Sequence, residues 1–327
     1  MSNARDFASR VPVDGALSNR NMIINGDFQV SQRGDFTSPY AYSSAGYAVD
    51  RWKLYDVGCD GRVTHKIKQL VDGRYTNTLY LECVTGGTGR LISRQLIEQP
   101  SGYSSHQLDG VTGTVSGWVK SNSPKARIYI YAGFYVEVAH SGNGQWEYLT
   151  ATITGVPANS PIEVGVQIDA GNNNNTSISA GDYFEIAYMQ LEYGSTATPF
   201  EHRSYGDELA RCQRYFHREK GPVHGKSMWT YSGTRASSVL NLPVAMRARP
   251  TFTYNATLEA TLSALDSICV FAVTNWKGCS SITSSASSNS NTRSVRLDAV
   301  FTTSITNGLS AGLYMNPDAY LDYDAEL

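Results

Sequence analysis

The sequence predicts an all-β protein with an N-terminal jelly-roll β-sandwich, one connecting α-helix and a smaller C-terminal β domain. Only 17% of the 327 residues are charged, whereas 29 Gly and 21 Tyr favour turns and half-buried strands. Short segments rich in β-branched and aromatic residues recur between clusters of Gly, Asn, Ser and Pro. The length also exceeds what one hydrophobic core usually organises, so we expect two domains.

Residues 1–20 are expected to form an attachment arm, because small and polar residues mix there with Pro12 and Gly15. They contain no apolar run of the signal-peptide kind, and no later segment approaches the roughly 18 apolar residues of a membrane helix. We therefore expect neither secretion nor membrane insertion.

Residues 21–203 are expected to form the sandwich, with strands in two packed antiparallel sheets. The predicted strands are 22–30, 49–57, 63–71, 77–85, 90–97, 113–121, 126–134, 146–154, 162–170 and 183–193. In 126–134, Tyr129 and Tyr131 alternate with Ile128 and Ile130. The aliphatic side should face the core, so the tyrosine side should face solvent, a partner or a ligand. The polar run 171–176 should be an exposed loop.

Residues 204–217 are expected to form the connecting helix. Leu209, Cys212, Tyr215 and Phe216 fall on one stripe, and the acidic start and basic end suit the helix dipole. Residues 218–327 resume strand patterns and predict the C-terminal β domain. Its serine-rich stretch 280–292 is expected to be a long loop.

Charge and cysteine content narrow the classes of function. Lys plus Arg total 27 against 29 Asp plus Glu, so the formal charge of -2 offers no field that would attract nucleic acid. The five cysteines lie at wide spacings without a CxxC pair, which indicates free thiols in a chain folded in a reducing cytoplasm.

The sequence contains no strong match to GxSxG, HExxH or a Walker loop, so we expect no enzyme. His202, His217 and His224 lie near one another in the sequence, but their spacing matches no recognised metal-ligand pattern. We expect these histidines to be exposed or packed.

Three blocks of the sequence resemble a module found in structural proteins of tailed bacteriophages. They are SNRNMIINGDFQVSQRG (18–34) with YAVDRW (47–52), QLEYGSTATPFEHRSYGDELARCQRYF (190–216), and LPVAMRARPTFT (242–253) with DAEL (324–327). In such proteins the first two blocks resemble the opening and closing strands of a carbohydrate-binding-like jelly roll. The helix then leads into a further β domain.

The resemblance implies a virion component assembled in the host cytoplasm: a tail fibre, head fibre or decoration protein, expected to be a homotrimer. Residues 1–20 would bind other virion proteins, and loops of one or both β domains would contact a polysaccharide of the host surface. Two alternatives stay open. One is a purely structural decoration or tail-connector protein, and the other is a capsule depolymerase that uses two carboxylates, although no β-helical repeat is visible.

Sugar binding commonly uses aromatic rings stacked on the apolar face of a pyranose, with polar side chains around them. The candidates are Tyr129, Tyr131, Tyr135, Trp118 and Trp146. Alternatively, the tryptophans belong to the core and the tyrosines form an exposed or trimer-facing row.

Jelly rolls of the carbohydrate-binding type often hold a structural Ca²⁺ between their first and last strands. Here Asn25, Asp27, Glu185 and Glu192 would supply the hard oxygen ligands that such an ion needs.

Overall fold

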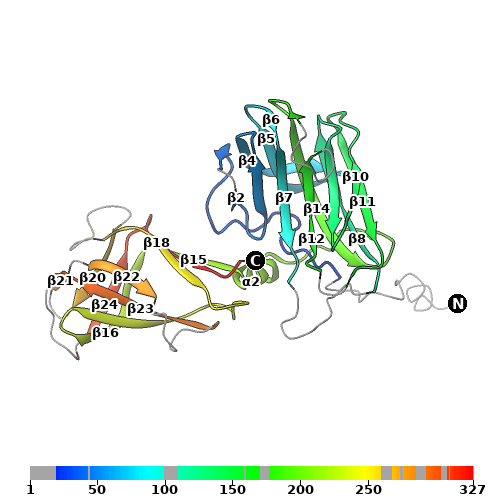
Figure 1. Cartoon of the computed structure of the whole chain (residues 1–327). Helices are drawn as coiled ribbons and strands as arrows, with labels where there is room; N and C mark the ends of the chain where they lie inside the picture. The colour runs from blue at the N-terminus through cyan, green and yellow to red at the C-terminus, as the bar shows by residue number, and fades with distance from the viewer. Residues whose placement is uncertain are drawn as a thin grey trace. The chain divides into compact units, whose positions relative to one another are not determined.

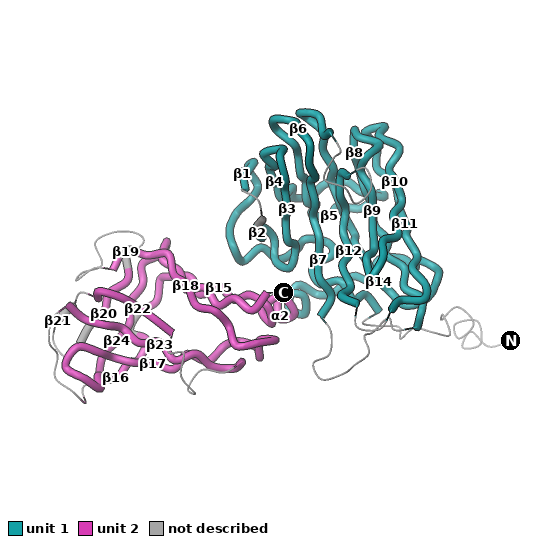
Figure 2. The backbone as a smooth tube through the Cα atoms, viewed as in Figure 1, with its two compact units in different colours: residues 1–208 teal, residues 209–327 magenta. Residues whose placement is uncertain are grey.

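The computed structural model describes residues 20–42, 45–98, 110–157, 160–169, 177–258, 267–272, 275–277, 279–284, 292–302, 308 and 310–326. The chain divides into two compact units, residues 1–208 and 209–327 (Figure 2). Strands dominate both units and each unit has its own core, so the all-β prediction is confirmed. No helix in the described ranges is long and apolar enough to cross a membrane.

Unit 1 is a β-sandwich of two six-stranded sheets (Figure 1). Sheet 1 has the order β1-β4-β5-β14-β8-β11: β1 (Tyr40–Ala41), β4 (Gly61–Val71), β5 (Arg74–Cys83), β8 (Gly113–Ser121), β11 (Trp146–Ile153) and β14 (Tyr183–Tyr193). Sheet 2 has the order β10-β9-β12-β7-β3-β2: β2 (Ala45–Tyr47), β3 (Lys53–Val57), β7 (Arg90–Leu96), β9 (Ala126–Tyr131), β10 (Tyr135–Ala139) and β12 (Glu163–Ile168). The short strands β6 (Gly87–Thr88) and β13 (Ser177–Ile178) pair with each other. The chain crosses repeatedly between the sheets, as in a jelly roll.

The core of unit 1 lies between the two sheets. Ile128 and Ile130 from β9 meet Val115 and Val119 from β8, and all four are fully buried. Burying one such side chain stabilises the fold by about 1.5–3 kcal/mol. The aliphatic side of 126–134 therefore faces the core, as the alternation predicted.

Most of residues 22–30 are buried, but the segment does not form the predicted first strand. Asn25 and Phe28 adopt positive φ values of 59° and 57°, which turn the chain out of the extended conformation. The Asn25 amide closes the resulting turn, because its nitrogen donates to the carbonyls of Val30 (2.8 Å) and Asp50 (2.9 Å). At Gly26 a Cβ would lie 2.1 Å from the Met189 carbonyl oxygen, so only glycine fits.

Strand β10 was missed by the sequence prediction. The predicted strand 126–134 ends at Tyr131, and Gly133 turns the chain with a φ of 83°. Tyr135–Ala139 then pairs antiparallel with β9. The predicted loop 171–176 and the arm 1–20, apart from Arg20, lie outside the described residues.

Helix α2 spans Tyr205–Gln213, shorter than the predicted 204–217. Ser204 caps its N-terminus, since the Ser204 hydroxyl oxygen accepts the Asp207 N–H at 3.2 Å. The helix has the expected charges, with Asp207 and Glu208 in its first turn and Arg211 in its last. The division between the two units falls inside this helix.

Unit 2 contains two further sheets. One is β15-β25-β18: β15 (Phe216–Lys220), β25 (Tyr320–Asp324) and β18 (Thr251–Asn255). The other is β19-β20-β24-β16-β17-β23-β22, with β21 beside β20: β16 (Val223–Ser232), β17 (Arg235–Asn241), β19 (Thr257–Leu258), β20 (Ser267–Ala272), β21 (Asn275–Lys277), β22 (Cys279–Ser284), β23 (Ser294–Phe301) and β24 (Ser310–Met315).

Strand β22 corrects the prediction of a loop over 280–292. Its residues pair with β23, and Ile282 is buried in the core of unit 2. Cys279 and Ile282 are the two side chains of β22 in this core, and they tie the start of the serine-rich segment to the sheet. The five cysteines are free and buried, in agreement with the prediction of free thiols.

Candidate functional site

The structure places the five aromatic candidates on two opposite faces of the sandwich. Tyr129 and Tyr131 lie on β9 and Tyr135 on β10, all on the outer face of sheet 2. Trp118 and Trp146 lie on β8 and β11, on the outer face of sheet 1. Because packed sheets stand roughly 10 Å apart, the five residues cannot form one site.

The surface on sheet 2 is termed the tyrosine face. It comprises Tyr129, Tyr131, Tyr135, Glu137, Glu163, Gln167, Arg94 and Arg127. The Tyr135 ring lies 4.6 Å from the Tyr131 ring and 5.7 Å from the Tyr129 ring. Tyr131 and Tyr135 are half-buried, so both offer ring surface to solvent.

Tyr129 is fully buried, so its side chain does not face solvent, which was one of the three surroundings predicted for the tyrosine side. Its hydroxyl donates to Glu163 Oε1 at 2.6 Å, and the Arg94 guanidinium donates to Glu163 Oε2 at 2.6 Å. Burial, followed by the Glu163 carboxylate, raises the pKa of Tyr129 well above its usual value. Tyr129 therefore remains a protonated donor that orients Glu163 beneath the other two rings.

A second carboxylate on the tyrosine face is held in a similar way. Gln167 Nε2 donates to Glu137 Oε1 at 2.5 Å, and Arg127 Nη1 lies 3.4 Å from Glu137 Oε2. Between Glu163 and Gln167, a Cβ on Gly165 would lie 2.2 Å from the Ser93 carbonyl oxygen, so this position also requires glycine. The face thus fixes donors and acceptors beside two partly exposed rings.

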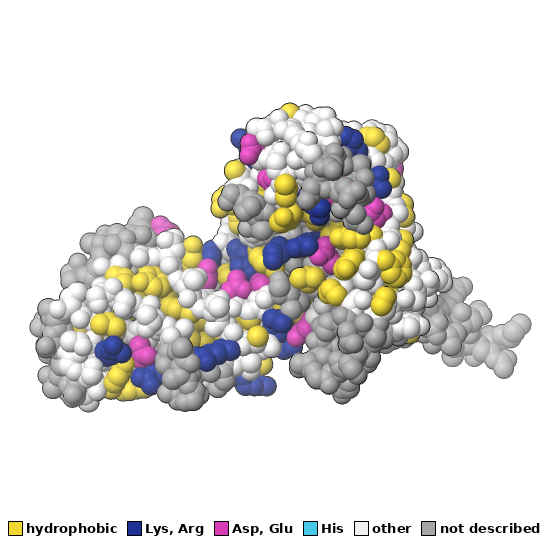
Figure 3. Space-filling model, viewed as in Figure 1, with side chains coloured by type: hydrophobic (Ala, Val, Ile, Leu, Met, Phe, Trp, Pro, Cys, Tyr) yellow, Lys and Arg dark blue, Asp and Glu magenta, His cyan; other side chains and the backbone are white. Residues whose placement is uncertain are grey.

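Figure 3 shows hydrophobic side chains, with Tyr counted among them, next to side chains of both charges on the visible face of unit 1. A mixed aromatic and polar surface such as the tyrosine face suits ligands that have both apolar patches and hydroxyl groups.

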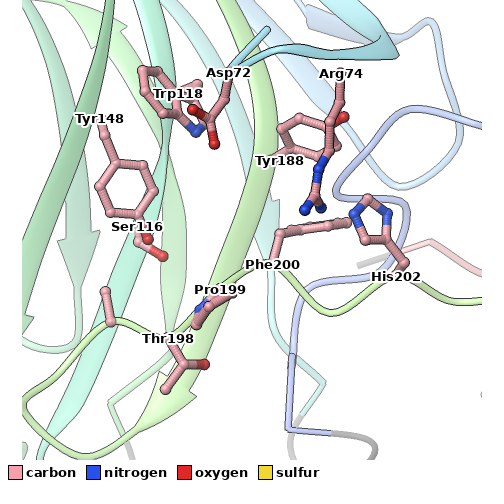
Figure 4. A pocket seen from close by; sticks show the side chains of 11 residues that line it. Asp72, Arg74, Ser116, Trp118, Tyr148, Tyr188, Thr198, Pro199, Phe200 and His202 are labelled. Atoms are coloured by element: carbon pink, nitrogen blue, oxygen red, sulfur yellow. The ribbon is translucent and has the colours of Figure 1, made fainter.

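The surface on sheet 1 contains a pocket of about 500 Å³, termed the tryptophan pocket (Figure 4). It is lined by Asp72, Arg74, Ser116, Trp118, Tyr148, Tyr188, Ala197, Thr198, Pro199, Phe200 and His202. Trp118 is half-buried with its ring 5.5 Å from that of Tyr148, and Trp146 packs nearby against the cluster of Val71, Ala187 and Tyr188. Neither tryptophan belongs to the core between the sheets, so the core position that the alternative gave to the tryptophans is wrong.

The four predicted calcium ligands do not come together. Glu185 and Glu192 lie seven residues apart on β14, which separates them by roughly 20 Å at about 3.3 Å per residue, whereas ligands of one Ca²⁺ lie within about 2.6 Å of it. Each predicted ligand has other partners. Lys66 and Thr78 donate to Glu185 at 2.9 and 2.6 Å.

Glu192 accepts the N–H and the hydroxyl of Thr198, both at 2.7 Å, and Asp27 accepts from Gln29. The side-chain amide of Asn25 bonds to backbone groups of its own turn. Within the described ranges, no group of three or more His, Cys, Asp or Glu side chains could hold a metal ion. The four predicted residues therefore do not form one Ca²⁺ site.

The histidines show the packed and exposed settings that were expected. His217 stacks on Tyr323 with ring centroids 5.8 Å apart, and burial lowers the pKa of its imidazole. His202 is exposed at the edge of the tryptophan pocket. The side chain of His224 lies outside the described part.

The sequence analysis missed several residues of both surfaces. Glu163 and Gln167 alternate in the predicted strand 162–170 on the side away from its aliphatic residues, so the same period of two that selected the tyrosines could have found them. Asp72 precedes Gly73 between two predicted strands, an Asp-Gly pair that is typical of a tight hairpin turn.

Comparison with known proteins gives fold-level similarities only. No protein-family model matches the chain, and no curated protein matches it. The enzymatically active domain of bacteriophage CBA120 tailspike protein 4 is similar over 53% of this chain and 21% of its own length, with 12% identity and a TM-score of 0.36.

Two carbohydrate-binding modules are also similar. The CBM22-1 xylan-binding domain of Paenibacillus barcinonensis Xyn10C matches over 51% of this chain and 100% of its own length (14% identity, TM-score 0.28). The family 11 module of Clostridium thermocellum Lic26A-Cel5E matches over 50% of this chain and 99% of its own length (10% identity, TM-score 0.29).

Proposed function

We propose that this chain is a non-catalytic carbohydrate-binding component of a tailed-phage virion, and that its tyrosine face holds a polysaccharide of the host surface. The observation that carries the proposal is the partly exposed pair of Tyr131 and Tyr135 rings, 4.6 Å apart, beside the Glu163–Arg94 ion pair. Rings of this kind pack on the apolar faces of pyranoses, while charged groups bind their hydroxyls.

The fixed geometry of the face supports binding because little side-chain freedom is left to lose. Glu163 is held by Tyr129 and Arg94, and Glu137 by Gln167 and Arg127. A preorganised surface loses less conformational entropy when the ligand arrives. Both carboxylates are neutralised by arginines, an arrangement that suits hydrogen bonding to a sugar better than acid catalysis, so a depolymerase is not favoured.

The virion assignment rests on the three blocks that resemble phage structural proteins. In this proposal the chain assembles in the host cytoplasm as a homotrimer, residues 1–20 bind other virion proteins, and three copies of the tyrosine face engage one cell. Linking weak sites in this way raises the overall avidity by orders of magnitude without any new contact.

The test measures binding of the labelled full-length protein to a panel of bacterial cells, before and after periodate oxidation of their surface sugars. We expect the protein to bind cells of the panel and periodate to abolish this binding. The double variant Tyr131→Ala/Tyr135→Ala should bind the cells more weakly by roughly tenfold or more. Tyr75→Ala is the matched control, since Tyr75 is 76% exposed and lies on sheet 1.

Unchanged binding by the folded double variant would contradict a role for the tyrosine face. If the folded oligomer bound no cells of the panel, the purely structural role in the virion would replace the proposal.

A further inference from the structure

The tryptophan pocket is a second concave surface, on the sheet opposite the tyrosine face. In Figure 4, Trp118 and Tyr148 stand on one side of the hollow, and Tyr188, Phe200 and His202 stand on the other. The volume of about 500 Å³ falls within the roughly 300–1,000 Å³ of small-molecule sites. Two aromatic walls across one hollow suit a ligand whose two opposite sides are apolar.

The far wall exists because β14 contains a β-bulge. The pairing of β14 with β8 shifts between Ala187 and Gln190, and Tyr188 adopts a φ of 53°. The bulge directs both Ala187 and Tyr188 to the outer face, where strict alternation would send one of them inward. A positive φ is unfavourable for a bulky residue, so the conformation that places the Tyr188 ring lowers the stability of the fold.

The exit segment after β14 completes that wall and is firmly anchored. Glu192 accepts both the N–H and the hydroxyl of Thr198, and the Glu201 N–H donates to Gln190 Oε1 at 2.8 Å. Phe200 is thereby held with its ring 5.1 Å from Tyr188 and 5.0 Å from His202. The far wall of the pocket is therefore held by the bulge and by the Glu192 and Gln190 side chains that anchor the exit segment.

The polar groups of the pocket come from a hairpin tip and from its two walls. Asp72 and Gly73 form the turn between β4 and β5, with φ values of 50° and 72°. Both residues line the pocket: in Figure 4 the Asp72 carboxylate lies on the side of Trp118, and the Arg74 guanidinium lies on the side of Tyr188 and Phe200. Both residues are exposed, and neither side chain has a hydrogen bond or an ion pair with another residue in the described ranges.

The charges of the pocket balance. Asp72 contributes one negative charge and Arg74 one positive charge. Partial desolvation and the positive charge of Arg74 lower the pKa of His202, so this imidazole is neutral at neutral pH. A neutral ligand with hydroxyl groups can donate to the carboxylate and accept from the guanidinium without leaving either charge unmatched.

We infer that the tryptophan pocket binds one neutral pyranose residue between its aromatic walls, with Asp72 and Arg74 bonding to the sugar hydroxyls. This inference deepens the proposed function and rests on it, because it gives the sandwich a second sugar site with a different ligand shape. The tyrosine face takes an extended chain, whereas the pocket takes a single terminal or branching unit.

The test uses saturation-transfer NMR on the full-length protein with methyl glycosides of neutral hexoses and N-acetylhexosamines, and with hexuronates for contrast. We expect transfer to at least one neutral glycoside and weakening of its binding by roughly tenfold in Tyr148→Ala. Tyr193→Ala is the matched control, because Tyr193 lies on the same sheet with the same 43% exposure but does not line the pocket. Asp72→Asn should weaken binding without altering the aromatic walls.

The outcomes separate the pocket from the tyrosine face. Loss of glycoside binding in Tyr148→Ala but not in Tyr131→Ala/Tyr135→Ala supports the inference, whatever polysaccharide the tyrosine face binds. Absence of transfer from every neutral glycoside, or a preference for hexuronates, would overturn it. Oligomer dissociation in Tyr148→Ala would overturn it too, by making the pocket an interface between copies of the chain.

Discussion

The tyrosine face and the tryptophan pocket lie on opposite sheets of one sandwich, and their aromatic rings are held by different means. On the tyrosine face, side-chain charges support the rings, as the hydrogen bonds of Tyr129 and Arg94 to Glu163 show. In the tryptophan pocket, backbone irregularities place the groups: a bulge directs Tyr188 outward, and a hairpin turn presents Asp72.

This difference predicts how each surface responds to substitution. On a flat sheet face, the backbone alone does not fix the position of an aromatic ring. Ion pairs and hydrogen bonds between side chains on neighbouring strands must fix it instead. The bulge fixes the Tyr188 ring through the backbone, so the loss of a pocket-lining polar side chain such as Arg74 should disturb the pocket less. Side-chain deletions should therefore cost more stability on the tyrosine face.

The largest expected effect comes from Arg94→Ala. It leaves the carboxylate of Glu163, a residue only 8% exposed, without its guanidinium. Breaking a buried ion pair costs about 3–5 kcal/mol, and the 27% exposure of the Arg94 side chain places this change at the low end, about 3 kcal/mol. Urea denaturation should show this loss, while Arg74→Ala in the pocket should cost less than about 0.5 kcal/mol. Equal losses would refute the proposed difference between the surfaces.

The second effect concerns Asp27, a carboxyl group that lies buried in the fold. Burial raises the pKa of Asp27 to about 6, against the hydrogen bond from Gln29. Between about pH 4 and pH 6 the unfolded chain loses this proton while the folded chain keeps it, so stability falls as the pH rises.

Asp27→Asn should remove this decrease in stability with rising pH. At about 1.4 kcal/mol per pKa unit, the variant should gain about 2–3 kcal/mol over the natural chain between pH 4 and pH 7. The measurement is the difference in unfolding free energy between the two proteins across that range. A difference that does not change with pH would show that Asp27 is ionised in the fold.

The third and smallest effect compares one change on both surfaces, namely loss of a tyrosine hydroxyl. Tyr129→Phe removes a buried hydrogen bond to a carboxylate and should cost about 1.5 kcal/mol. Tyr148→Phe removes a hydroxyl from a side chain that is 43% exposed and should cost almost nothing. Thermal unfolding of the two variants measures both losses of stability. A larger loss of stability in Tyr148→Phe than in Tyr129→Phe would contradict the proposed difference between the two surfaces.

The sequence predicted what depends on alternation alone. Strands β8 and β14 begin and end where the pattern placed them, and the aliphatic side of β9 faces the core. Alternation could not show that Tyr129 and Trp118 point to opposite sides of the molecule, because that depends on which sheet each strand joins. Nor could it show the bulge at Tyr188, where one extra residue reverses the side-chain direction.

The blocks that resemble phage proteins have structural roles in the fold. In unit 1 the Asn21 N–H donates to Glu201 at 2.8 Å, and Arg203 Nη1 donates to the Ile23 carbonyl at 2.9 Å, which joins the first block to the second. In unit 2 the Ala325 N–H donates to the Tyr215 carbonyl at 2.7 Å, which joins the closing block to the helix end. All of the tyrosine face lies outside these blocks, so the resemblance could predict the fold but not the binding residues.

The most direct test of the central claim is an NMR titration of full-length protein labelled in its tyrosine rings with a surface polysaccharide that it binds on cells. Tyr131 and Tyr135 signals should shift with saturating polysaccharide, while the signal of the exposed control Tyr75 should stay unchanged. Shifts confined to other tyrosines, with Tyr131 and Tyr135 unaffected at saturation, would contradict the assignment of the tyrosine face as the polysaccharide-binding surface.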